Sequence, residues 1–172
     1  MRITRTAPIL LFAMFACGCG ESFVPIAPAV GTAPDASVQN TLQMRIDGIE
    51  WRADHEVFGA FHPPGYERAL IVAGARGAKD ANEQQFNINL FGIDGPGRYP
   101  IRNGDAAGSV AQLANYTPER FIAGSMMGYD LLVDVRVASA APAHIEAGFS
   151  GTLTGNDGVV MKIEDGRFVY RE

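Results

Sequence analysis

Histidine is the residue type best suited to acid–base chemistry and metal binding near neutral pH, and the chain has three. The first, His55, begins the run HEVFG, whereas a zinc-binding helix of the His-Glu-x-x-His type needs a second histidine at the end of the motif. Asp54 and Glu56 flank His55 in a predicted strand, where neighbouring side chains point to opposite faces. We therefore expect three solvated side chains, with His55 facing away from both acids. His62 falls in a predicted loop, His144 precedes a predicted strand, and no metal site is predicted.

Serine and paired acids form no recognisable catalytic arrangement. Ser150 lies in GFSG within a predicted strand, and not on the strand-to-helix turn that carries a hydrolase nucleophile. Asp130 and Asp134 share one face of a predicted strand, where we expect two solvent-facing acids and not a glycosidase pair. Asn156-Asp157-Gly158 lacks the series of acids of a calcium loop and predicts a hairpin turn. We predict no catalytic residue, no cofactor and no metal.

Aromatic and proline residues indicate a contact surface instead. The run HPPGY, residues 62–66, predicts a stiff loop in which two prolines reduce the entropy lost on binding and Tyr66 adds a rigid ring. The alternative is a simple link between two strands. Trp51 can stack on a sugar or a partner protein, or it can fill the core or an edge of a small β domain. Other tyrosines either add to this surface or cap the core: Tyr99, Tyr116 and Tyr129.

An all-β, antiparallel domain over residues 42–172 would position these side chains. Apolar and polar residues alternate in several runs: 44–46, 86–90, 131–137, 145–153 and 159–163. Turn residues such as Asp47-Gly48 separate the runs, and 20 Gly with 10 Pro argue against a helical bundle. We predict a β-sandwich or partly open barrel of about eight to ten short strands. Its last hairpin should point Phe149 inward, together with Ile145 and Leu153.

Local departures from this alternation lead to further predictions. Leu70–Ala73 is a continuous apolar run, as in a central strand covered on both faces. After Leu90 the apolar phase shifts to Phe91 and Ile93, which one extra residue in a bulge would explain. Thr117-Pro118-Glu119 has the sequence of a helix start, but long amphipathic helix patterns are absent and we do not favour a helix there.

The first 16 residues have the layout of a secretion signal. Arg2 and Arg5 supply a positive start, and residues 8–15 (PILLFAMF) form an apolar run that is too short to span a bilayer. We therefore assign residues 1–16 to a signal peptide.

Two cysteines, Cys17 and Cys19, follow this signal directly. A bacterial lipoprotein signal ends in small residues and a cysteine that receives the lipid, so we predict lipid attachment at one of these two; the alternative is an ordinary cleaved signal. A glycine follows either cysteine (Gly18 or Gly20), which favours the outer membrane over retention at the inner one. Residues 17–41 then form a lipidated N-terminus with a Pro- and Ala-rich tether. With no further cysteine, the domain needs no disulfide.

Composition narrows the classes of partner. The chain has 14 Lys+Arg against 19 Asp+Glu, a net charge of −5, which is not suited to gripping a nucleic-acid backbone. Hydrophobic residues make up 47%, enough for a packed core. The predicted partners are the membrane, through the lipid anchor, and an envelope protein or polysaccharide.

Four segments carry a resemblance to a known family: 44–53 (MRIDGIEWRA), 97–101 (GRYPI), 148–153 (GFSGTL) and 160–168 (VMKIEDGRF). The chain resembles a family of small bacterial lipoproteins of unknown function, which show an I-D-G-x-x-W-x-A opening and a closing hairpin with G-x-F-S-G-T-L and I-x-D-G-x-F. The resemblance covers most of residues 43–169, without 55–65 and 103–128. It implies a β-sandwich and supplies no site residues.

Three functions remain open at this point. The first is a non-enzymatic binding or structural module on a membrane tether in the bacterial envelope. The second is an inhibitor or immunity-like protein, and the third is an envelope hydrolase with a site built from loops. The absence of a recognisable catalytic motif favours the first.

Overall fold

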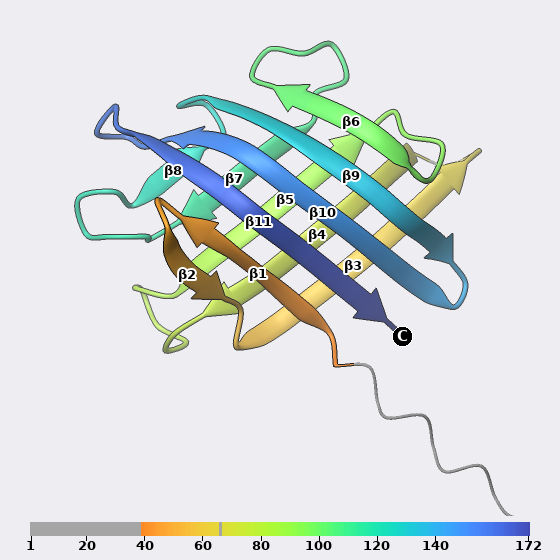
Figure 1. Cartoon of the computed structure of the whole chain (residues 1–172), viewed down its shortest axis with the longest axis horizontal. Helices are drawn as coiled ribbons and strands as arrows, with labels where there is room; N and C mark the ends of the chain where they lie inside the picture. Colours follow the sequence, from red (N-terminus) through yellow and green to blue (C-terminus); the bar gives the residue numbers. More distant parts are fainter. Residues whose placement is uncertain (1–38, 66) are drawn as a thin grey trace, which may run out of the picture. The chain divides into compact units, whose positions relative to one another are not determined.

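The computed structural model describes residues 39–65 and 67–172. The predicted signal peptide, both cysteines, most of the predicted tether and Tyr66 lie outside the described residues. Within them the chain forms strands and turns only (Figure 1). Eleven strands follow one another: β1 (Thr41–Ile46), β2 (Ile49–Arg52), β3 (His55–Pro64), β4 (Glu67–Arg76), β5 (Gln84–Phe91), β6 (Gly97–Arg102), β7 (Val110–Ala114), β8 (Ile122–Gly124), β9 (Tyr129–Ala140), β10 (Ala143–Thr154) and β11 (Val160–Arg171).

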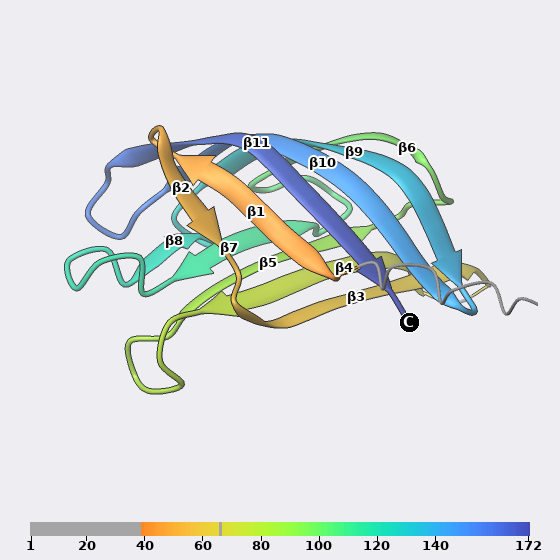
Figure 2. The same ribbon diagram turned by 60° about the horizontal axis from the view of Figure 1, so that its bottom comes forward.

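The strands form two antiparallel sheets that face each other (Figure 2). One sheet has six strands in the order β2-β1-β11-β10-β9-β6, and the other has five in the order β3-β4-β5-β7-β8. The sheets stay separate and do not close into a barrel. The predicted all-β sandwich is therefore confirmed, with eleven strands instead of eight to ten.

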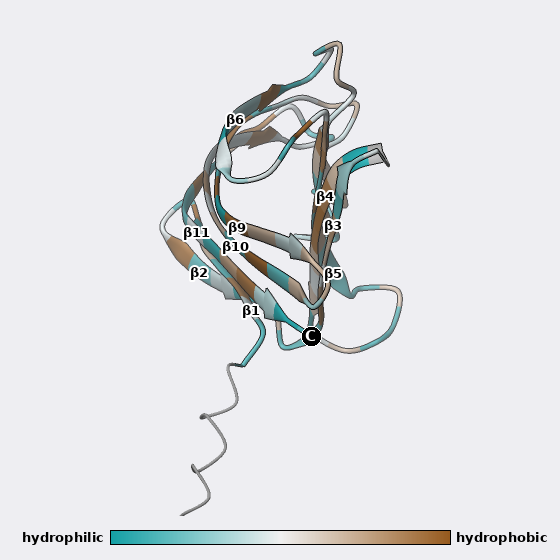
Figure 3. Cartoon of the chain, turned by 90° about the vertical axis from the view of Figure 1, so that its right-hand side faces the viewer, coloured by the Kyte–Doolittle hydropathy of each residue, from teal (hydrophilic) through white to brown (hydrophobic). Residues whose placement is uncertain are grey.

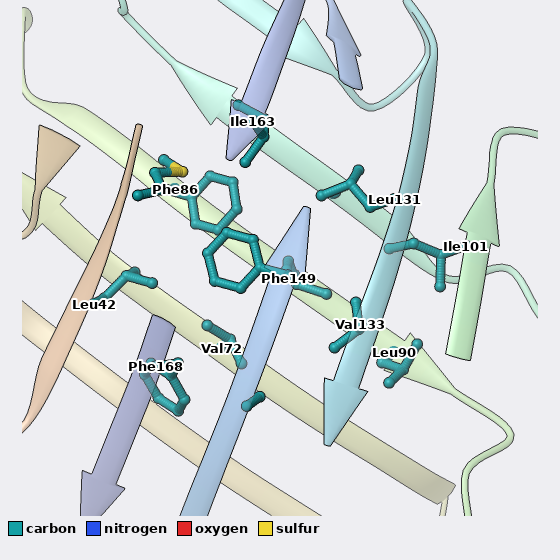
Figure 4. Close-up of a cluster of buried hydrophobic side chains, with 14 of the residues drawn as sticks. Leu42, Val72, Phe86, Leu90, Ile101, Leu131, Val133, Phe149, Ile163 and Phe168 are labelled. Atoms are coloured by element: carbon teal, nitrogen blue, oxygen red, sulfur yellow. The ribbon is translucent and has the colours of Figure 1, made fainter. Parts of the chain in front are cut away.

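Hydrophobic and hydrophilic residues follow one another along the strands of both sheets, as the hydropathy colours of Figure 3 show. The buried apolar residues of both sheets form one core cluster. Phe149 is 5% exposed and points inward between Ile145 and Leu153, as predicted. Its ring stacks on Phe86, with centroids 5.3 Å apart and planes 16° from parallel (Figure 4). Because the two rings come from different sheets, this stack joins the two layers at the centre of the core.

Two Asp-Gly pairs shape the chain in different ways: the predicted turn forms at Asp47-Gly48, and a bulge forms at Asp165-Gly166. Asp47 and Gly48 have φ of 50° and 82°, the left-handed pair of a tight hairpin turn between β1 and β2. At Asp165-Gly166 the chain does not turn: β11 runs through it with a bulge against β10. The ring of Phe149 lies on Gly166, where an added Cβ would come within 2.4 Å of ring carbons.

Two predictions about strand packing are wrong. β4 lies between β3 and β5, but its two faces are not equally buried. Leu70 and Val72 face the core. On the outer face Ile71 and Ala73 are half-buried and only the small side chains of Ala69 and Ala75 are buried, because no layer of the described chain covers this face. β5 has no bulge after Leu90. Its last residue, Phe91, is 37% exposed, and the left-handed Gly92 turns the chain so that Ile93 is buried.

Thr117-Pro118-Glu119, which has the sequence of a helix start, forms no helix. These residues form a turn, in which the backbone N–H of Arg120 donates to the carbonyl and to the hydroxyl oxygen of Thr117, both at 3.0 Å. The threonine side chain therefore closes a single turn here and does not start a helix.

Candidate ligand-binding groove

The predicted contact loop is the end of a long hairpin. β3 and β4 pair as far as Pro64 opposite Glu67, and a turn begins at Gly65. His62 pairs with Ala69 and is a half-buried strand residue, which corrects its prediction as a loop residue. Tyr66 is outside the described residues, and its role stays a prediction.

β3 is an edge strand with one side open. It pairs with β4 on one side, and no strand of the described chain pairs with the other. Both ends of this open edge are irregular. A bulge shifts the register between His55 and Phe58, with Glu56 at φ 51°, and Pro63 and Pro64 follow at the other end. Bulges and prolines are common protections of edge strands.

A groove of about 410 Å³ lies along this open edge. One wall consists of six consecutive β3 residues, 58–63. The other wall comes from the turn between β9 and β10 and from the end of β11, which lie beside β3 (Figure 2). The lining is mainly apolar, with His62, Tyr170 and Glu172 as its ionisable side chains. The second wall is made of Ala140, Ala143, Tyr170 and Glu172.

A line of three aromatic rings leads from this groove into the core. Phe58, 48% exposed, meets Tyr170 edge-on with ring centroids 5.9 Å apart. Tyr170 is parallel to the fully buried Phe168 at 6.4 Å. Gly59 allows β3 to approach this closely, because an added Cβ would lie 2.9 Å from the Phe168 ring. The exposed ring of Phe58 is thus held in place by a buried aromatic base.

The imidazole ring of His55 lies between two carboxylates, so the prediction that this side chain is solvated is wrong. Its Nδ1 contacts Asp54, and its Nε2 lies 2.6 Å from Oε1 of Glu83. The side chains of His55 and Glu83 are only 19% and 11% exposed. Hydrogen bonds to Glu83 and then to Asp54 raise the pKa of His55, and the hydrogen bond from His55 lowers the pKa of Glu83.

This cluster fastens the loop between β4 and β5. The N–H of Gly77 donates to Asp54 at 3.1 Å and lowers its pKa, and Lys79 pairs with Glu56 at 2.6 Å. Asn115, which follows β7, donates to the carbonyl of Glu83 at 3.0 Å. The hydrogen-bond partners of the cluster are amides, carboxylates and the ammonium group of Lys79. The arrangement therefore holds the loop between β4 and β5 in place.

Trp51 is a core residue and not part of the groove. It is 1% exposed, and its Nε1 donates to Oε1 of Gln84 at 2.8 Å. Its face is covered by the core and offers no surface to a sugar, which corrects its place among the candidate contact residues. The described tyrosines pack against the core as well: Tyr99, Tyr116, Tyr129 and Tyr170.

The acids singled out in the sequence form ion pairs on the surface. Asp130 pairs with Arg102 at 3.1 Å and Asp134 with Arg136 at 3.3 Å. Asp157 lies in the predicted hairpin turn, between β10 and β11. Surface pairs of this kind contribute about 0–1 kcal/mol each.

The last histidine and the serine lie on the outer face of the six-stranded sheet. His144 is the second residue of β10, and its Nε2 lies 2.9 Å from Oε1 of Glu146. The same carboxylate oxygen accepts a hydrogen bond from Arg171. Ser150 is exposed on the same strand. Neither lines the groove.

Sequence reasoning missed Phe58 and Tyr170, the aromatic pair of the groove. They are far apart in the chain, and each looks like an ordinary strand residue in its own segment. The only local signal was the apolar run around Phe58, in HEVFGAF, which continues into the prolines of the predicted loop.

Comparisons with protein-family models, curated proteins and solved structures gave no significant match. The resemblance to small bacterial lipoproteins therefore stays a prediction. Across residues 39–65 and 67–172, no three or more His, Cys, Asp or Glu side chains gather as a metal site would need. The same residues contain no helix long and apolar enough to cross a membrane.

Proposed function

We propose that the chain is a non-catalytic binding module, held by a lipid at the bacterial envelope, that takes its ligand in the groove beside β3. The observation that supports this is the groove itself, an apolar hollow along an open strand edge with an exposed aromatic ring at its wall. Apolar concavities with a few polar groups are the usual form of a ligand site.

The aromatic pair makes this groove energetically suited to binding. The ring of Phe58 is half exposed, so a ligand that covers it removes apolar surface from water. Full burial of a phenylalanine side chain is worth about 1.5–3 kcal/mol relative to exposure, so the exposed half contributes roughly 1 kcal/mol. Because Tyr170 already supports the ring, little side-chain entropy is lost on binding.

Attachment to the envelope rests on the N-terminal sequence. A signal peptide over residues 1–16, a lipid on Cys17 or Cys19 and a tether up to residue 41 would hold the domain near the outer membrane. Mass spectrometry of the mature N-terminus tests this. A diacylglycerol-modified cysteine is expected, and an unmodified terminus beyond residue 19 would reject the anchor without affecting the groove.

Two matched phenylalanine variants test the role of the groove. Phe58→Ala removes the ring in the groove wall, and Phe121→Ala removes an equally exposed ring elsewhere, since Phe121 is 57% exposed and does not line the groove. Each protein is used to capture binding partners from envelope extract, and the bound material is quantified. We expect Phe58→Ala to lose most of the captured material and Phe121→Ala to match the wild type. Equal capture by all three proteins would reject the groove as the binding site.

A further inference from the structure

The wall of the groove on the β3 side consists of residues that are consecutive in the chain. It is built from six residues in a row, 58–63. Neighbouring side chains of a strand point to opposite faces, so six consecutive residues can share one groove only through their common backbone edge. The groove therefore runs along backbone that β4 leaves unpaired.

The regular part of this edge has a defined length. The bulge ends before Phe58 and the prolines begin after His62, which leaves five regular residues between them. At about 3.4 Å per residue they span roughly 17 Å. Irregularities at both ends limit uncontrolled pairing with other chains, whereas the middle keeps a straight strand edge that a partner strand can use.

The surrounding side chains select among possible partner strands. Ala60, Ala140 and Ala143 leave room beside the edge, and Phe58 with Tyr170 offers an aromatic surface. These surfaces suit apolar side chains. Glu172 adds a carboxylate at the groove, so a cationic residue of a partner would be paired there.

We propose that this groove binds an extended, apolar segment of a partner polypeptide, with at least one basic residue, which pairs with β3 as an additional strand. This proposal names the ligand class of the binding module and rests on the proposed function. Backbone hydrogen bonds to β3 supply affinity, and the groove beside it selects the side chains.

A second copy of this chain is a less suitable occupant on grounds of charge. The full chain has 14 Lys+Arg and 19 Asp+Glu; without Arg2, Arg5, Glu21 and Asp35, the described residues carry 12 − 17 = −5. Two such domains repel each other, whereas a basic segment is attracted. In a pairing of two β3 edges, Glu172 would also meet no Lys or Arg side chain from residues 58–62 of the other copy.

The test uses the predicted mature chain, residues 17–172, with both cysteines changed to serine. A phage-displayed library of random seven-residue peptides is selected on this protein and, in parallel, on its Phe58→Ala and Phe121→Ala variants. We expect enrichment of apolar peptides with a basic residue on the wild type and on Phe121→Ala, and loss of it on Phe58→Ala.

A synthetic copy of the best peptide then separates strand pairing from side-chain binding. Methylating the peptide's alternate backbone nitrogens on one edge removes its hydrogen-bond donors there and keeps every side chain. We expect methylation of one of the two edges to weaken binding about tenfold or more. We also expect the unmethylated peptide to slow hydrogen exchange at alternate amides of residues 58–62.

Three results would overturn the proposal. No enrichment on the wild type over Phe58→Ala rejects peptide binding in the groove, and the envelope capture experiment then decides separately on the proposed function. Equal affinity of the methylated and unmethylated peptides rejects strand pairing while the groove remains a binding site. Enriched peptides that copy residues 58–62 or residues 23–30 of this chain would identify a second copy or the chain's own N-terminal segment as the occupant.

Discussion

Truncating Phe149 to alanine should be among the most damaging single changes in the core. A buried Phe→Ala change costs about 3–5 kcal/mol in unfolding free energy. Two features place Phe149 in the upper part of this range. Its ring stacks on Phe86, and such aromatic pairs add about 0.5–1.5 kcal/mol beyond burial. The ring also lies on Gly166, which has no side chain to fill the cavity left behind. We therefore expect a loss of about 4–5 kcal/mol.

Equilibrium unfolding in urea measures this loss. With a dependence on urea of about 2 kcal/mol/M, a loss of 4 kcal/mol lowers the midpoint by about 2 M. Phe91→Ala is the matched control, because Phe91 is 37% exposed at the end of β5; losing the buried part of its ring should cost only about 1–2 kcal/mol. A midpoint for Phe149→Ala equal to that of Phe91→Ala would refute the placement of this ring at the centre of the core.

Two further predictions concern the backbone and the effect of pH. Gly151→Ala should destabilise by about 2–4 kcal/mol, because φ is 148° and a Cβ would lie 2.1 Å from the carbonyl oxygen of Asp130. Gly92→Ala, with open space around it, should cost only about 1 kcal/mol, and equal urea midpoints for the two variants would contradict this. His55→Gln should flatten the pH dependence of the melting temperature above pH 6.5. The folded pKa of His55 is raised from 6.5, so its contribution is complete below pH 6.5 and is lost as the pH rises through the folded value. If the melting temperatures of wild type and variant depend on pH in the same way, the hydrogen bond between His55 and Glu83 does not stabilise the fold as expected.

The strands and turns were predictable because their signals are local. Alternation of apolar and polar residues follows from the two-residue period of a strand, so residues such as Phe149 could be assigned to the core from their own segment. Asp47-Gly48 predicts its turn because glycine and aspartate tolerate left-handed backbone. The helix-start sequence at Thr117 did not distinguish a helix from a single turn, because a threonine side chain accepts the same backbone hydrogen bond in both.

The all-β class and most inward-facing side chains of the strands could be assigned from the amino-acid sequence. Which strands are neighbours, that Trp51 fills the core and that Glu83 meets His55 became known from the packed fold. The contact of Phe58 with Tyr170 beside an open strand edge is also a product of packing. A strand's period is a property of its own backbone, whereas pairing, edges and grooves depend on how segments distant in the chain pack around one core.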